Sequence, residues 1–147
     1  MLASDEGGQV IAPGGINANL APDAFLRWAR HYHACRHTFQ PPDRFSPVPY
    51  FLLCRAIELA VKARHLGTLT QDDVKHRFGH DLVKAYAALN PVHRVLGADE
   101  ERVLTAASEI YAEKGFEYFD PEDALTGFSR YPSLDDLDAI ARKLVGV

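Results

Sequence analysis

The chain has 147 residues, of which 47% are hydrophobic, and this length and composition are typical of one domain with a single core. Its 16 Lys and Arg against 20 Asp and Glu give a net charge of -4. This excludes a uniformly basic surface, so any site that binds nucleic acid must be local. Cys35 and Cys54 lie among apolar residues of predicted helices, where a free thiol behaves as a small hydrophobe, as is typical of a reducing cytoplasm. Because no apolar run could span a bilayer and the N-terminus has no hydrophobic signal core, we expect a cytoplasmic protein, neither secreted nor membrane-inserted.

Residues 1–19 are predicted to form an extended, irregular N-terminal arm, followed by a single domain over residues 20–147. The arm contains four glycines and a proline between short apolar groups, so it has no helical period and little strand propensity. An arm without its own core is ordered by docking, so we expect it to pack on a second copy, in a homodimer, or to cap the bundle. The apolar side chains that should then be buried are Val10, Ile11, Ile16 and Leu20.

The first helix is predicted to start near Pro22 and to end before Pro41. Its apolar residues recur at helical spacing and should face the core; they are Phe25, Trp28, Ala29, Tyr32 and Cys35.

The same helix carries three arginines and three histidines between residues 27 and 37, the densest cationic patch in an acidic chain. Arg30, His33 and His37 share one edge of the apolar face, and Arg27 lies with His31 on the other. Such edges can bind phosphate, and the alternative is a solvated polar face. His33 and His37 could both reach a metal, but no third ligand stands at a recognisable spacing, so no metal site is predicted.

A second helix is predicted from Pro47 to about Leu66, and apolar residues surround it almost completely, as expected of a central helix. Its polar residues form one stripe, at steps of three and four: Arg55, Glu58, Lys62 and His65. Glu58 and Lys62 form either an exposed pair worth about 0.3–0.5 kcal/mol or part of a cleft with shifted pKa values. If Glu58 and Lys62 meet His80 at one cleft, Glu58→Gln should weaken binding more than it changes stability, because an exposed pair contributes little to folding.

The remaining segments are also predicted to be helical. Thr70 can cap a short helix ending at Gly79, His80 starts a segment reaching about Leu89, and a long helix runs from Asp99 to Lys114. An aromatic, irregular connection over 116–131 precedes a last amphipathic helix that begins at Ser133. The fold class expected is therefore all-α, an antiparallel bundle of four to five helices.

Three short motifs occur in order along this helical region: the run 56–63 (AIELAVKA), the turn 79–82 (GHDL), and 130–132 (RYP) before the closing helix. Over roughly residues 47–147 the chain resembles the HEPN superfamily of small helical domains. The resemblance implies an all-α bundle, commonly dimeric, with the Glu-x-x-x-Lys helix in its core. It also implies pairing with a nucleotidyltransferase, or a role in RNA cleavage or nucleotide binding.

Nuclease members of that superfamily carry an arginine followed four to six residues later by a histidine on a late helix. Here the last histidine is His93, so the helix from Asp99 to Lys114 cannot supply this pair, and its absence argues against catalysis. Arg27 and His33 have the right spacing but lie on the first helix. They are the candidate catalytic residues of the alternative, a metal-independent ribonuclease acting as a dimer.

We therefore expect a non-catalytic domain without a cofactor that binds a nucleotide, RNA or a protein partner such as a nucleotidyltransferase. Glu58, Lys62 and His80 should meet at one cleft although they are distant in sequence. Arg55, Arg30 and His37 are the further candidate binding residues. A third alternative is a protein assembly module that docks through its arm and aromatic turn.

Overall fold

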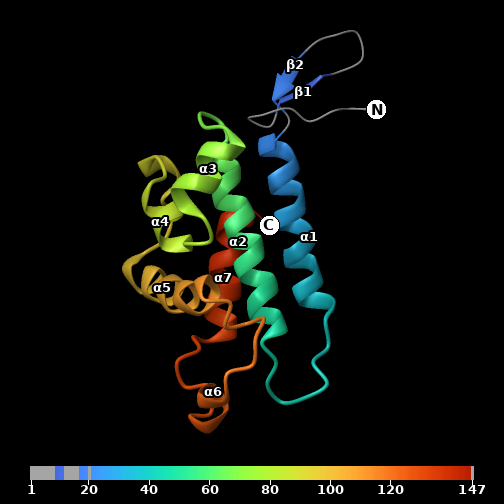
Figure 1. The fold of residues 1–147 in the computed structure, drawn as a ribbon, viewed down its shortest axis with the longest axis vertical. Helices are drawn as coiled ribbons and strands as arrows, with labels where there is room; N and C mark the ends of the chain where they lie inside the picture. The colour runs from blue at the N-terminus through green and yellow to red at the C-terminus, as the bar shows by residue number, and fades with distance from the viewer. Residues whose placement is uncertain (1–8, 12–16, 20, 147) are drawn as a thin grey trace.

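The computed structural model of the chain describes residues 9–11, 17–19 and 21–146. Its longest elements are α1 (Ala21–Thr38) and α2 (Val48–His65), which lie side by side (Figure 1) and are joined by a loop over 39–47. The last helix, α7 (Leu134–Val145), contacts both of them, and α4 (Leu82–Ala87) and α5 (Ala98–Ala112) pack on α2 as well. This arrangement confirms the prediction of an all-α bundle.

α2 is the central helix, as its sequence predicts. Pro49 lies in its first turn, where a missing N–H costs nothing, and the side chains of Leu53, Ile57 and Val61 are completely buried. The partners α1, α4, α5 and α7 surround it, which explains why apolar residues occupy most of its circumference. Within the part of the chain that the structure describes, no helix is long and apolar enough to cross a membrane.

The described residues contain seven α-helices, more than the four to five expected. Three of them are short. α3 (Gln71–Phe78) and α4 correspond to the helical segments predicted after Thr70 and from His80, whereas α6 (Pro121–Leu125) has too few turns for a clear apolar period and was not predicted. Each starts at a capping side chain, namely Thr70, Asp81 and Asp120. α6 lies inside the connection predicted to be irregular, and a 3-10 turn (Pro91–His93) links α4 to α5.

Within the N-terminal arm the structure describes two short strands, in keeping with the expectation of no sheet larger than two short strands. Two strands, β1 (Gln9–Ile11) and β2 (Asn17–Asn19), pair antiparallel with Val10 opposite Ala18. Val10 and Ile11 are β-branched, and this preference for extended backbone outweighs the weak pattern around them. The structure does not describe the side chains of Val10, Ile11, Ile16 and Leu20, so their burial and the homodimer that rests on it stay predictions.

The buried face of α1 is rotated from the one predicted. Trp28 is 59% exposed and Cys35 is also exposed, whereas Ala29 and His33 are buried. A helix packed at one side of a bundle buries only a narrow stripe, and the spacing of apolar residues does not fix the centre of that stripe. The centre is set instead by contacts with α2 and α7.

Candidate functional site

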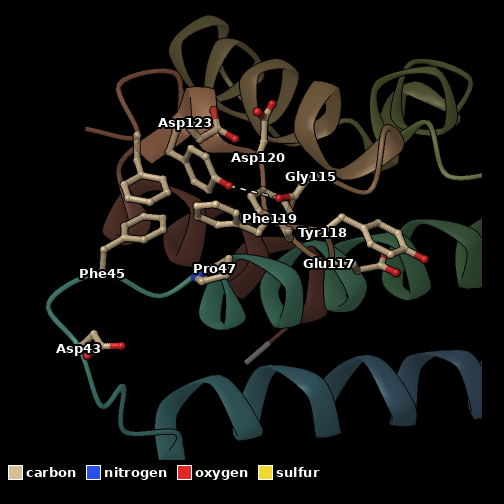
Figure 2. Close-up of a pocket in the computed structure, with 12 residues that line it drawn as sticks. Asp43, Phe45, Pro47, Gly115, Glu117, Tyr118, Phe119, Asp120 and Asp123 are labelled. Carbon is tan, nitrogen blue, oxygen red and sulfur yellow. Dashed lines mark hydrogen bonds between the residues drawn. The ribbon is translucent and has the colours of Figure 1, made fainter. Parts of the chain in front are cut away.

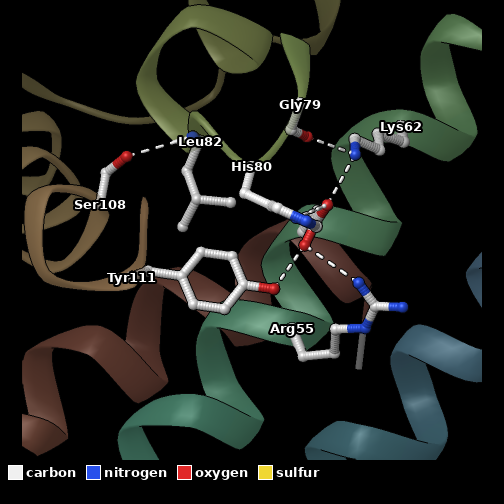
Figure 3. A network of polar contacts seen from close by, with 8 residues as sticks. Arg55, Lys62, Gly79, His80, Leu82, Ser108 and Tyr111 are labelled. Carbon is white, nitrogen blue, oxygen red and sulfur yellow. Dashed lines mark hydrogen bonds and ion pairs between the residues drawn. The ribbon is translucent and has the colours of Figure 1, made fainter. Parts of the chain in front are cut away.

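Glu58 is the centre of a buried polar network, and only 2% of its surface is exposed. Figure 3 labels the side chains around it, among them Arg55, Lys62 and Tyr111. Lys62 Nζ donates to its Oε2 over 2.6 Å, and His80 Nδ1 lies 2.9 Å from the same oxygen. Arg55 Nη1 donates to Oε1 over 3.2 Å, and the Tyr111 hydroxyl donates to Oε1 as well. The carboxylate therefore has four side-chain partners, which is how a buried charge is tolerated.

These side chains come from three separate parts of the chain. Arg55, Glu58 and Lys62 follow each other at helical spacing on α2, as the sequence indicates. Gly79 ends α3 with a φ of +53°, a conformation that favours glycine, and its carbonyl accepts from Lys62 Nζ over 2.6 Å. This turn brings the next residue, His80, onto Glu58, so the three side chains expected at one cleft do meet.

The pKa of Glu58 reflects opposing influences. Burial by itself raises it, but the hydrogen bonds from Lys62 and Tyr111, with the charges of Lys62 and His80, hold the pKa below its ordinary value. Burial and the neighbouring carboxylate both raise the pKa of Tyr111, which keeps its hydroxyl protonated as a donor to Glu58. Glu58 is therefore an anion in the folded protein at neutral pH.

This direction gives a prediction for acid stability. A carboxyl group with a lowered folded pKa contributes stability above its unfolded pKa and loses it as the pH falls through the folded value. The free energy of unfolding should therefore decrease once the pH drops below about 4.5, the ordinary value for Glu58. Urea denaturation at a series of pH values should show a shallower decrease in Glu58→Gln than in the wild type. Parallel curves for the two proteins would exclude Glu58 as a source of the acid sensitivity.

A pocket of about 190 Å³ opens beside this network. It is lined by side chains of α2, α5 and their neighbouring turns: Phe51, Arg55, His80, Tyr111, Lys114 and Glu117. The side chain of His80 is 57% exposed and that of Arg55 is 33% exposed, whereas Lys62 shows only 11%. Arg55 and His80 can therefore touch a bound molecule. Lys62 does not line the pocket and contacts Glu58 instead.

A second pocket of about 400 Å³ adjoins the first, because Glu117 lines both. Figure 2 shows its aromatic and acidic lining, which includes Phe45, Tyr118 and Phe119 with Asp43 and Asp120. Tyr118 is 68% and Phe119 is 77% exposed, so both rings are free to meet a flat apolar group.

The Arg130-Tyr131-Pro132 turn borders this second pocket and is held by internal contacts. Arg130 forms a bidentate pair with Asp123, over 2.7 and 3.0 Å, and also binds Glu113. The Tyr131 hydroxyl donates to the Gly115 carbonyl over 3.3 Å. The Pro132 carbonyl accepts from the hydroxyl of Tyr50 on α2 over 2.8 Å. These bonds tie the connection before α7 to α2 and α5, so the motif has a structural role here.

The candidate residues on α1 do not reach the pocket beside Glu58. Arg30 and His37 are exposed on α1 and neither lines it. Arg27 is exposed and lies about 120° around the helix from His33. His33 is buried, with Nε2 2.9 Å from Asp138 Oδ1, so Arg27 and His33 form no site within one chain.

Sequence reasoning missed two further groups of residues. The sequence did not single out Tyr111, although a buried tyrosine hydroxyl needs a partner, and Lys114 and Glu117 gave no signal. Asp138 is 105 residues from His33, so no spacing rule could join them. No family model, curated protein or solved structure matches the chain, so the chemistry of the site follows from its own geometry.

Proposed function

We propose that the chain is a non-catalytic, HEPN-like domain that binds the phosphate of a nucleotide or of an RNA end in the pocket beside Glu58. The observation that carries the proposal is the charge of the pocket. One carboxylate, Glu58, is paired with two cations, Lys62 and Arg55, so the network retains a net positive charge. An anion is the ligand that such a pocket favours.

The exposed groups of the pocket fit a phosphate. Arg55 offers a planar guanidinium whose N–H groups match phosphate oxygens, and the carboxylate of Glu58 fixes its orientation. Lys114 adds a second cation to the lining of the pocket, and Glu117 adds a negative charge that offsets it. His80 contributes an imidazole that is 57% exposed. Because Glu58 already holds Arg55 in place, less side-chain entropy is lost when a ligand binds.

The neighbouring pocket supports a nucleotide rather than an isolated phosphate. Its exposed rings, Tyr118 and Phe119, can stack on a base, an interaction worth about 1–3 kcal/mol. Its acidic side chains, Asp43 and Asp120, repel a phosphate and thereby direct it toward Arg55.

The ribonuclease alternative has less support, because the Nε2 of His33 is buried against Asp138 and Arg27 lies on another face of α1. Pairing with a nucleotidyltransferase remains an expectation from the resemblance. Incubation of the chain with RNA in the absence of metal tests catalysis directly, and cleavage that is lost in His33→Gln would contradict the proposal.

Binding is tested by titrating the protein with ATP and with a short 5′-phosphorylated RNA, followed by calorimetry. We expect Arg55→Gln to weaken binding of both by about tenfold or more, because a hydrogen bond to a charged group is worth about 1.5–3 kcal/mol. The matched control is Arg94→Gln, an exposed arginine outside both pockets. Equal affinity of the two variants, or no binding by the wild type, would overturn the proposal.

A further inference from the structure

A second cluster of polar side chains joins the end of α1 to α7. His33 and His37 project from consecutive turns of α1, and Asp138 projects from α7. His33 Nε2 lies 2.9 Å and His37 Nε2 lies 3.2 Å from the same oxygen, Asp138 Oδ1. The Nε2 atoms and the carboxylate oxygen all lie within 4.8 Å of one another.

This cluster is separate from the Glu58 network, and it is largely shielded from water. The side chains of His33 and Asp138 are 8% and 13% exposed, whereas that of His37 is 42% exposed. His33 and Asp138 are therefore held in place by the packing of α1 on α7, and His37 lies at the surface. His37 is thus the member of the cluster most open to solvent.

Two of the spacings between these atoms match the coordination sphere of a small divalent ion. Ligand atoms at about 2.0–2.1 Å from a tetrahedral zinc are about 3.3 Å from one another, close to the two imidazole–carboxylate distances here. The two imidazole nitrogens, which lie within 4.8 Å of each other, come closer when the half-exposed side chain of His37 turns toward the ion. We propose that His33, His37 and Asp138 bind Zn²⁺ and that the ion links α1 to α7. A water on the side of His37 completes the tetrahedron.

The type of ligand selects the metal. Two imidazoles with one carboxylate suit zinc and its transition-metal neighbours, whereas magnesium and calcium prefer oxygen ligands alone. Arg142 Nη2 lies 3.7 Å from Asp138 Oδ2, the oxygen that the imidazoles leave free. Arg142 can thus orient the carboxylate while Oδ1 binds the ion, as outer partners do in zinc sites.

The test uses the chelator-treated chain of 147 residues, titrated with Zn²⁺ by calorimetry and heated with and without the ion. We expect Zn²⁺ to bind and to raise the melting temperature, because an ion bound only by the folded state stabilises it, and Mg²⁺ to do neither. Asp138→Asn and His37→Gln should each weaken Zn²⁺ binding by at least about tenfold, since even loss of an outer partner costs that much. His31→Gln, an exposed histidine of the same helix, should bind Zn²⁺ as the wild type does.

Three results would overturn the proposal. Absence of Zn²⁺ binding would mean that the cluster is only a hydrogen-bonded histidine–carboxylate pair. Unchanged affinity in Asp138→Asn would mean that α7 supplies no ligand, and an equal loss in His31→Gln would place the ion elsewhere on α1. His37→Gln keeps the test valid if Asp138→Asn folds poorly, because His37 is half-exposed.

Discussion

Glu58→Gln is expected to lower the free energy of unfolding by about 3–5 kcal/mol, the usual cost of removing one partner from a buried ion pair. From the sequence we expected this substitution to change stability little, on the premise that the pair is exposed. The structure excludes that case, since Glu58 is 2% exposed and the Lys62 side chain 11% exposed. Without the carboxylate, Lys62 and Arg55 remain close together as uncompensated cations.

Urea denaturation at neutral pH measures this effect. The matched control is Glu109→Gln, an exposed glutamate of α5, which should change stability by no more than about 0.5 kcal/mol. The double variant Glu58→Gln with Lys62→Met should recover part of the loss, because it also removes the unpaired buried charge. A loss below about 1 kcal/mol in Glu58→Gln would mean that the network contributes little to folding.

Ile57→Ala and Leu53→Ala are each expected to cost about 2–5 kcal/mol, the range for a large aliphatic side chain removed from a packed core. Both side chains are fully buried on α2, which is enclosed by four other helices, so little of the resulting cavity can collapse. Leu125→Ala is the control, because that leucine is 82% exposed and its removal should be almost neutral. Costs below about 1 kcal/mol at both core sites would contradict the central position of α2.

The local features of the fold were predictable because they depend on neighbours in sequence. Prolines and glycines mark the ends of α2, and the Thr70 capping box sets the start of α3. The stripe of Arg55, Glu58 and Lys62 follows from helical geometry alone. The short helix α6 was not predicted, since a single turn carries no reliable period.

The candidate site was predictable only in part. The resemblance led us to predict that His80 meets Glu58, and the two side chains are in contact in the structure. Tyr111 and Lys114 join the site only because α5 packs on α2, a contact that no pattern within α5 encodes. Likewise the face of α1 that is buried, with His33 inward and Trp28 outward, depends on where α7 lies.

The sequence by itself determined an all-α bundle with a central α2 and a polar stripe on that helix, because propensity, capping and periodicity act over a few residues. Only the tertiary structure decided that Glu58 is buried and that Asp138 meets His33 and His37. Burial and ligand geometry depend on helices that are distant in the chain, and their relative positions arise from packing of the whole core.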